Sequence, residues 1–386
     1  METDKYVIEG AEIVTPAGLV SETLLLESGR IARVGGVSPA EARDARVIKA
    51  CGQLVLPGLI DLHVQGAGGS DLLNDEPEAA SRVCAKLASF GTTAFLATTV
   101  IDTRRREQPH LRRIVECIEN MPSGARVLGI HLEGPFISIE KKGMIQEKYI
   151  RAVSRDYYEH VKEVCAGRLR MMTIAPELPG ALDIISDLAQ QGIIASLGHT
   201  NATYEQTLKG IQAGLSHVTH VGNAMRGFHH REPGAFGAAL MSDALTVQII
   251  ADGVHLHRAV AAWLIKIKGP SRFAIITDGI GAMGMLPGRY SYGTLEYTVE
   301  DGSARYVDGT LIGTALTQIQ LVQRTLDFTG LPLHEVVNMA SLYPARILGV
   351  ADRKGSIEEG KDADLVICDR ELNAKTVFLE GKQIPP

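Results

Sequence analysis

Histidine and acidic residues stand at the ends of apolar runs along this 386-residue sequence. Glu133, His199, His220 and Asp278 each end such a run or follow it directly, and so does His63. Two imidazoles and one carboxylate can hold a divalent ion and leave one position for a water molecule, whose pKa then falls to about 7. A nearby aspartate can take a proton from that water and pass it to a leaving group. These residues therefore predict a metal-dependent hydrolase.

Each of these residues also has an ordinary structural explanation. A single histidine after a strand is more often a hydrogen-bonded structural residue than a ligand, and Glu177, in the sequence Ala-Pro-Glu, could simply cap a helix. His255 follows another apolar run in the sequence DGVH, whereas His257 two residues later is a bystander. Because histidines and acids recur at the same end of successive runs, we interpret them together as one site.

A polar segment with two arginines follows His220. It covers residues 223–234 and reads NAMRGFHHREPG. An arginine among backbone amides is a natural clamp for a phosphate or a carboxylate. The alternative is a surface loop of mixed charge.

Eight short apolar runs spaced by amphipathic stretches must position these side chains. Such runs are typical of buried parallel strands that alternate with helices. Segments 79–88 and 182–190 have the helical spacing of apolar residues. A (β/α)8 barrel is predicted, because it directs all strand ends to one mouth, whereas a doubly wound open sheet is the rival architecture. The runs are residues 55–63, 92–98, 127–133, 170–175, 193–198, 215–220, 246–251 and 272–277.

The two ends of the chain have a different texture. Short β-type runs broken by turns occupy residues 5–55 and recur at residues 364–379. We expect an α/β protein, a (β/α)8 TIM-like barrel with a small β-sandwich domain built from both chain ends. The expected domains are residues 1–54 and 351–386 for the small β domain and residues 55–350 for the barrel.

Composition excludes several classes of function. The net charge is −6, and the longest basic run, at residues 104–106, is followed by an acid, so no nucleic-acid partner is expected. No apolar run reaches the roughly 20 residues that span a bilayer, so no membrane partner is expected. The five cysteines are scattered without a paired motif, which fits a reducing cytoplasm.

Over nearly its whole length the sequence resembles the N-acetylglucosamine-6-phosphate deacetylases of the amidohydrolase superfamily. The motifs that carry the resemblance are specific in this order and spacing. They are PGLIDLH at 57–63, LEGPFI at 132–137, GHTNAT at 198–203, TH at 219–220 with NAM at 223–225, HREPG at 230–234, ADGVH at 251–255 and TD at 277–278.

The resemblance implies a role for each matching residue. Glu133, His199 and His220 would bind the metal, Asp278 would be the catalytic acid and base, and His255 would polarise the acetyl carbonyl. Several residues would surround a phosphorylated amino sugar. They are Asn223, the Ala224 backbone, His230 and Arg231, the loop of Leu311, Ile312 and Gly313, and a second loop that begins at Gly143 and Met144. Arg231 would reach the neighbouring active site, which implies a homodimer.

Four positions depart from the family pattern. Many members have His-x-His after the first strand and hold two metals, but Gln65 takes the second position here. An amide is a weak ligand, so we expect one divalent ion, zinc first and iron as the alternative, with His63 and Gln65 as outer or partial ligands. Met144 and Ile145 replace a small residue and a sugar-contacting histidine, and Gly279 replaces the usual alanine. These changes leave the identity of the sugar open.

The leading hypothesis is hydrolysis of the N-acetyl group of N-acetylglucosamine 6-phosphate, or of a closely related amino-sugar phosphate, to the free amine and acetate. A second hypothesis is an amidohydrolase for another amide: N-acetylgalactosamine 6-phosphate, a cyclic ureide or an N-acyl amino acid. A third is a barrel scaffold that has lost catalysis, which the residue Gln65 suggests. Such a scaffold would have no reason to keep the four residues at the strand ends.

Overall fold

Eight parallel strands form the centre of the computed structural model, which describes residues 5–73, 76–293 and 295–384. They pair in chain order, each with the next, and the bridge between Val64 and Gly279 closes the first strand onto the last. The predicted (β/α)8 barrel is therefore confirmed. Its strands are β8 (Leu59–Val64), β11 (Thr92–Thr99), β12 (Arg126–Glu133), β13 (Leu169–Ile174), β14 (Ile194–Leu197), β15 (His217–Val218), β16 (Thr246–Ile249) and β17 (Phe273–Ile275).

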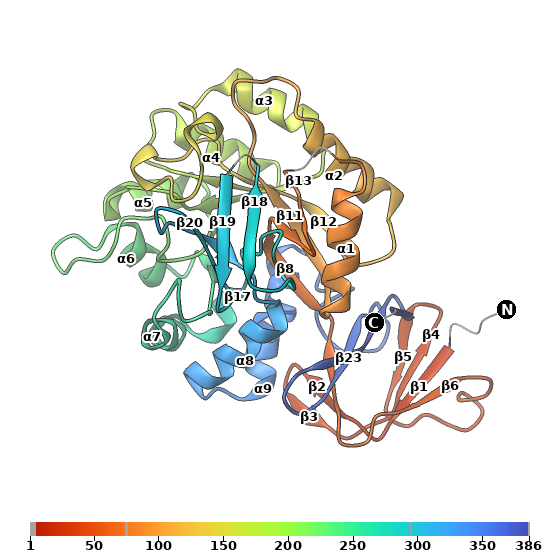
Figure 1. The fold of residues 1–386 in the computed structure, drawn as a ribbon. Helices are drawn as coiled ribbons and strands as arrows, with labels where there is room; N and C mark the ends of the chain where they lie inside the picture. The colour runs from red at the N-terminus through yellow and green to blue at the C-terminus, as the bar shows by residue number, and fades with distance from the viewer. Residues whose placement is uncertain (1–4, 74–75, 294, 385–386) are drawn as a thin grey trace.

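Helices follow the strands and cover the outside of the barrel (Figure 1). The two segments predicted as helices are confirmed as α1 and α4. No helix in the described ranges is both long and apolar enough to cross a bilayer. The helices are α1 (Ala79–Ser89), α2 (Pro109–Asn120), α3 (Arg155–Val164), α4 (Ala181–Gln190), α5 (Tyr204–Ala213), α6 (Gly234–Met241), α7 (Arg258–Lys268), α8 (Gln318–Thr329), α9 (Leu333–Met339) and α10 (Leu342–Ile347), with short 3-10 turns η1 (Ile139–Lys141), η2 (Glu147–Tyr149) and η3 (Pro270–Arg272).

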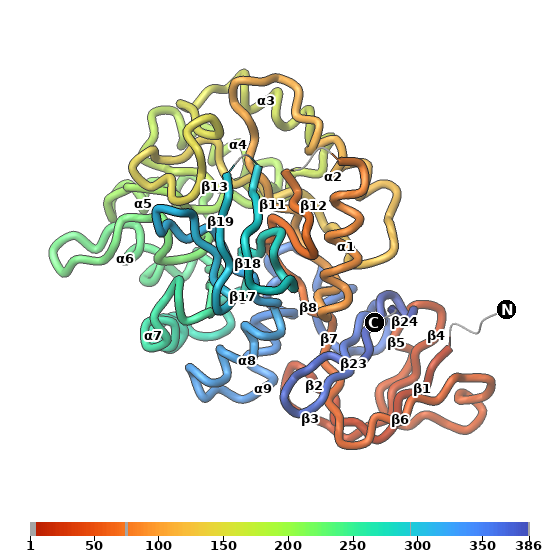
Figure 2. The backbone as a smooth tube through the Cα atoms, viewed as in Figure 1, coloured from red at the N-terminus to blue at the C-terminus, as the bar shows by residue number. Residues whose placement is uncertain are grey.

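The two chain ends form a small β region beside the barrel, where the red and blue segments lie together (Figure 2). One sheet has the order β5-β4-β1-β6 and the other the order β24-β23-β22-β7-β2-β3. Side chains from both ends, such as Ile8, Val55 and Phe378, share one core. The prediction of a small β structure from both ends is confirmed. Its strands are β1 (Lys5–Glu9), β2 (Glu12–Thr15), β3 (Gly18–Val20), β4 (Leu24–Glu27), β5 (Arg30–Val34), β6 (Arg46–Lys49), β7 (Leu54–Pro57), β22 (Leu365–Cys368), β23 (Ala374–Leu379) and β24 (Lys382–Ile384).

The first apolar run of the sequence divides into two strands at Gly58. Before it, β7 pairs with β22 and β2 of the small sheet, and after it, β8 enters the barrel. A side chain at Gly58 would approach the Thr93 hydroxyl oxygen to 2.2 Å, so only glycine fits where the chain crosses between the two cores. The crossing places His63 at the far end of β8.

Two short antiparallel sheets lie at the barrel mouth. A two-stranded ribbon, β9 (Gly66–Ala67) with β10 (Ser70–Asp71), follows β8. A four-stranded sheet is inserted between β17 and α8 and consists of β18 (Gly288–Tyr292), β19 (Leu295–Glu300), β20 (Ser303–Tyr306) and β21 (Leu311–Thr314). The bridge between Gly279 and Thr314 joins this inserted sheet to the end of β17.

The structure corrects one expectation about the inserted sheet. Leu311, Ile312 and Gly313 were expected in a loop, but they belong to β21, where Leu311 pairs with Arg305 of β20. Ile312 is buried in the core of the inserted sheet, which favours a strand over a mobile loop. Gly313 approaches the carbonyl oxygen of Asp278, because a side chain there would come within 2.3 Å of it. These residues thus support the end of β17.

Candidate metal centre

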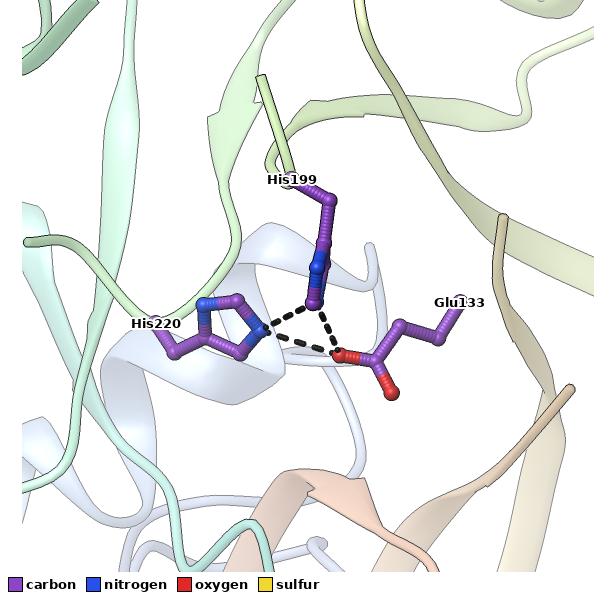
Figure 3. Close-up of side chains that lie close together, drawn as sticks. All are labelled: Glu133, His199 and His220. Atoms are coloured by element: carbon purple, nitrogen blue, oxygen red, sulfur yellow. Dashed lines mark hydrogen bonds and ion pairs between the residues drawn. The ribbon is translucent and has the colours of Figure 1, made fainter. Parts of the chain in front are cut away.

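Glu133, His199 and His220 converge at the carboxyl ends of β12, β14 and β15 (Figure 3). The Oε1 atom of Glu133 lies 3.0 Å from Nε2 of His199 and 2.9 Å from Nε2 of His220, and the two imidazole nitrogens are 3.1 Å apart. All three side chains are buried. The structure therefore brings together the three residues that the sequence singled out as a ligand set.

The arrangement fits a divalent transition metal. Donors about 2.0–2.2 Å from a tetrahedral zinc ion are roughly 3.3–3.6 Å from one another, so these three atoms need to move apart by only a few tenths of an ångström to hold one. The Nδ1 atom of His199 lies 2.9 Å from the carbonyl oxygen of Lys141, so it carries the proton and leaves Nε2 with a free lone pair. Burial lowers the pKa of His220, which favours the neutral imidazole that a metal requires.

The backbone is left-handed at several site residues. His199, His220, Ala224 and Asp278 have φ angles of 46°, 28°, 47° and 47°. This conformation is uncommon for residues other than glycine and persists where surrounding contacts enforce it. In each case it comes where a strand or its following loop turns over the mouth, so the chain accepts strain where it carries functional side chains.

His63, Gln65 and Asp278 form a second group beside the three ligands. Nε2 of His63 lies 3.2 Å from Oδ1 of Asp278 and 3.6 Å from Oε2 of Glu133. Burial alone would lower the pKa of His63, but the carboxylates of Asp278 and Glu133 raise it to about 9. The Gln65 amide nitrogen also contacts both carboxylates, at 3.0 and 3.2 Å. Asp278 is therefore held at the mouth by two neighbours.

His255 is fixed by Asp252 at the end of β16. Nδ1 of His255 lies 2.6 Å from Oδ2 of Asp252, while Oδ1 of Asp252 accepts the backbone N–H groups of Val254 and His255. Burial opposes the charge of Asp252, but these bonds hold its pKa below the ordinary value. The Asp252 carboxylate thus fixes the orientation of the His255 ring through Nδ1.

Polar residues beneath the mouth were not identified from the sequence. Gln248 accepts from Nδ1 of His63 at 3.2 Å and from the backbone N–H of His220 at 3.3 Å, and so orients both imidazoles. Asp61 accepts from the hydroxyl of Thr277, and its burial raises its pKa to about 7. Polar residues inside otherwise apolar runs were the available signal, and Asp61 stands in the PGLIDLH motif itself.

The site residues proposed to bind the substrate lie in two places. Gly143 lies against the metal group, because a side chain at this glycine would come within 3.3 Å of His199 Cε1 and 3.5 Å of Ala224 Cβ. Asn223 turns its amide nitrogen back to the carbonyl oxygen of His220, at 3.2 Å. Met144 packs between the inserted sheet and the apolar cluster that contains Ile145. Gly143, Asn223 and Ala224 therefore lie beside the ligands, whereas Met144 lies against the apolar clusters.

His230 and Arg231 lie instead on an exposed hairpin. The bridge between His229 and Glu232 closes this hairpin, which protrudes beside α6 (Figure 1). Nη1 of Arg231 lies 2.7 Å from Nε2 of His230, and both side chains are exposed to solvent, unlike the buried metal group. Within one chain, the arginine is therefore not part of the site.

Two remaining positions have local structural explanations. Glu177 accepts from the Thr200 hydroxyl and from the Asn201 backbone N–H, both at 2.6 Å, so it supports the loop after His199 rather than a helix. At Gly279, a side chain would collide with the Met283 methyl group at 1.9 Å. Met283 thus occupies the space that an alanine side chain would take, and the departure at Gly279 is accommodated inside the protein.

Comparisons with known proteins agree with this geometry. The model of the amidohydrolase family matches residues 54–384. An N-acetylglucosamine-6-phosphate deacetylase of Bacillus subtilis is 34% identical over 382 residues, which cover 98% of this chain and 96% of that protein. An N-acetylgalactosamine-6-phosphate deacetylase of Escherichia coli O157:H7 is 33% identical over 377 residues, which cover 98% of each chain.

A solved structure extends the likeness to three dimensions. A mutant N-acetyl-D-glucosamine-6-phosphate deacetylase of Mycobacterium smegmatis, in complex with N-acetyl-D-glucosamine 6-phosphate, has a TM-score of 0.91 at 31% identity. The alignment covers 99% of this chain and all of that one. The chain is therefore an enzyme of the amidohydrolase superfamily, and it belongs to the N-acetylglucosamine-6-phosphate deacetylase family.

Proposed function

We propose that this enzyme hydrolyses the N-acetyl group of N-acetylglucosamine 6-phosphate and releases acetate and the free amino sugar phosphate. The observation that carries the proposal is the buried group of Glu133, His199 and His220 with Asp278 beside it, in a chain of this family. The galacto epimer is the second candidate, because a relative named for it is about as similar as one named for the gluco epimer.

The residues at the mouth divide the work of amide hydrolysis. A divalent ion held by Glu133, His199 and His220 would activate a water molecule and polarise the acetyl carbonyl. Asp278 has one carboxylate oxygen held by His63 and Gln65, which leaves the other to accept the water's proton and deliver it to the departing amine. His255, fixed by Asp252, directs Nε2 to the carbonyl oxygen as negative charge develops there. We propose one metal per site, zinc first and iron as the alternative.

The substrate is tested by acetate release. The purified enzyme, with its metal content measured, is incubated with N-acetylglucosamine 6-phosphate, with the galacto epimer and with unphosphorylated N-acetylglucosamine. We expect release from the gluco phosphate at a kcat/KM at least ~10-fold above that for unphosphorylated N-acetylglucosamine, because a site for a charged group discriminates strongly against its absence. We also expect a higher kcat/KM for the gluco phosphate than for the galacto phosphate. A preference for the galacto phosphate would replace the proposed sugar. No acetate from either phosphate, with metal bound, would refute this substrate class.

We also propose that the enzyme acts as a homodimer in which Arg231 binds the phosphate at the neighbouring subunit's site. Arg231 stands on the protruding hairpin, away from the metal group of its own chain. Apolar side chains on the hairpin and on the two helices that follow it are exposed: Phe228 on the hairpin at 58%, Met241 at the end of α6 at 72%, and Trp263 on α7 at 45%. Exposed apolar groups on neighbouring elements are typical of an interface between subunits.

Mixed dimers test this arrangement. Arg231→Ala and Asp278→Asn are each expected to be nearly inactive, but a mixed dimer would have one site with neither defect. Random pairing of equal amounts should therefore restore about a quarter of the wild-type activity. Mixing Asp278→Asn with His220→Ala is the control and should restore none, because both defects stay in their own subunits. No recovery in the first mixture, with dimers present by size exclusion, would show that Arg231 does not act across the interface.

A further inference from the structure

The amide nitrogen of Gln65 lies between two carboxylates at the barrel mouth. It is 3.2 Å from Oε2 of Glu133 and 3.0 Å from Oδ1 of Asp278. Glu133 uses its other oxygen, Oε1, toward His199 and His220. The two oxygens of Glu133 therefore face different partners, the candidate metal on one side and an uncharged amide on the other.

The chemistry of the neighbours determines which end of the amide faces them. Ionised carboxylates only accept hydrogen bonds, so the NH2 group of Gln65, with its two donors, must point at Glu133 and Asp278. The amide oxygen then faces the Tyr292 hydroxyl, which lies 2.7 Å away. Gln65 and Tyr292 are 1% and 2% exposed, so water cannot readily replace either partner.

Tyr292 comes from the inserted sheet, 227 residues along the chain from Gln65. It is the last residue of β18 and belongs to the apolar core of that sheet. Burial raises the pKa of Tyr292 well above its ordinary value, so the hydroxyl keeps a proton to donate to the amide oxygen. A side chain of the insertion thereby fixes the orientation of an amide at the end of β8.

The place that the amide nitrogen occupies is surrounded by donors suited to a cation. Nε2 of His63 approaches the same two carboxylate oxygens as the amide nitrogen, at 3.2 Å from Oδ1 of Asp278 and 3.6 Å from Oε2 of Glu133. The carboxylates of Glu133 and Asp278 would repel each other unless positive groups lay beside them. The N–H hydrogens of Gln65 supply positive ends to both carboxylates, next to the His63 imidazole.

We propose that the Gln65 amide, held by the Tyr292 hydroxyl, takes the place of a second cation and that Tyr292 is thereby a positioning residue for Asp278. The role of Asp278 in turnover rests on the proposed function. The number of ions that the protein binds can be measured without any substrate. Metal binding therefore tests the inference even if the substrate proposal fails.

The first experiment replaces the amide by an isosteric carboxylate. Gln65→Glu would place three carboxylates and His63 around one position, and we expect it to bind two equivalents of Co²⁺ or Zn²⁺ per chain where the wild type binds one. Gln65→Met, which has a similar size and no charge, is the matched control and should bind one. Metal content after gel filtration and the Co²⁺ absorption spectrum give the readout. One equivalent in a folded Gln65→Glu protein, at metal concentrations that saturate the first site, would overturn the inference.

The second experiment removes only the Tyr292 hydroxyl. Tyr292→Phe frees the Gln65 amide to rotate, so we expect kcat to fall about 10-fold with KM and the single metal unchanged. In the Gln65→Glu background the same change should weaken binding of the second ion by about 10- to 100-fold, because the hydroxyl supports the new ligand. Chelator competition measures that affinity.

Tyr290→Phe is the matched control for Tyr292, since Tyr290 lies on the same strand and donates to the carbonyl oxygen of Leu286 instead. It should change neither kcat nor the affinity for the second ion. Equal behaviour of Tyr292→Phe and Tyr290→Phe would overturn the role of Tyr292. If Gln65→Glu fails to fold, kcat and KM of the two phenylalanine variants still decide.

Discussion

Replacing Asp278 by asparagine is expected to lower kcat by about 10²- to 10⁴-fold while the protein keeps its metal. Asparagine has the size of aspartate, and its carbonyl oxygen can still accept from the Gln65 amide, which lies 3.0 Å from Oδ1 of Asp278. The side chain would therefore keep its place but could no longer accept a proton. Because the amide is a poor base, proton transfer from the water to the departing amine should fail.

Steady-state kinetics and metal content must be measured on the same sample. We expect KM to change little, since Asp278 is not proposed to hold the sugar phosphate. Asp183→Asn is the control, because Asp183 lies exposed in the first turn of α4 and should leave kcat unchanged. A kcat within tenfold of the wild-type value for Asp278→Asn would exclude this residue as the acid and base. A loss of metal would instead place it among the ligands.

The barrel and the position of its site could be predicted from the sequence for the same physical reason. Parallel strands are buried on both faces, so they appear as short apolar runs, and the residue after each run must lie at one mouth. The strand-end pattern placed Glu133, His199 and His220 among six candidates at this mouth, and the family resemblance selected these three as the ligands. The structure brings their ligand atoms within 4.8 Å of one another. The pattern of apolar runs therefore predicted the architecture and the position of the site, whereas the ligand set came from the resemblance.

The contacts that orient the site could not be predicted, since no local pattern encodes them. Gln248, on β16, supports both His63 and the backbone of His220, but in the sequence it is one polar residue in an apolar run. Tyr292 meets Gln65 only because the inserted sheet folds over the mouth. The register of an insertion relative to a barrel depends on tertiary packing, which a single sequence does not display.

The residue at which the chain passes from the core of the small sheet to the core of the barrel could not be predicted from the sequence either. Residues 55–63 form one apolar run in the sequence, yet Pro57 pairs in the small sheet and Leu59 pairs in the barrel. An apolar run satisfies either core equally well. Only the close approach of Thr93 to Gly58 reveals where the chain changes partners.

Loss of the His220 imidazole is expected to abolish both metal binding and activity. His220→Ala removes one of the three proposed metal ligands, the imidazole whose Nε2 contacts Oε1 of Glu133. The two remaining donors would hold a divalent ion far more weakly, and the buried carboxylate would lose one of the neighbours that keep its pKa well below the ordinary value. We expect less than about a tenth of an equivalent of metal after dialysis and kcat reduced by more than about 10³-fold.

Chelation of the wild type should reproduce this loss, and one equivalent of zinc or iron should reverse it. The variant should not recover at the same metal concentration, which separates loss of the ligand from loss of the ion. His160→Ala is the matched control. His160 lies on the outer helix α3, where its ring contacts the carbonyl oxygen of Arg106, so the variant should keep both metal and activity. Full metal content in folded His220→Ala would contradict the assignment. The ion would then have to be held by another donor set, of which His63 with Asp278 and Glu133 is the nearest.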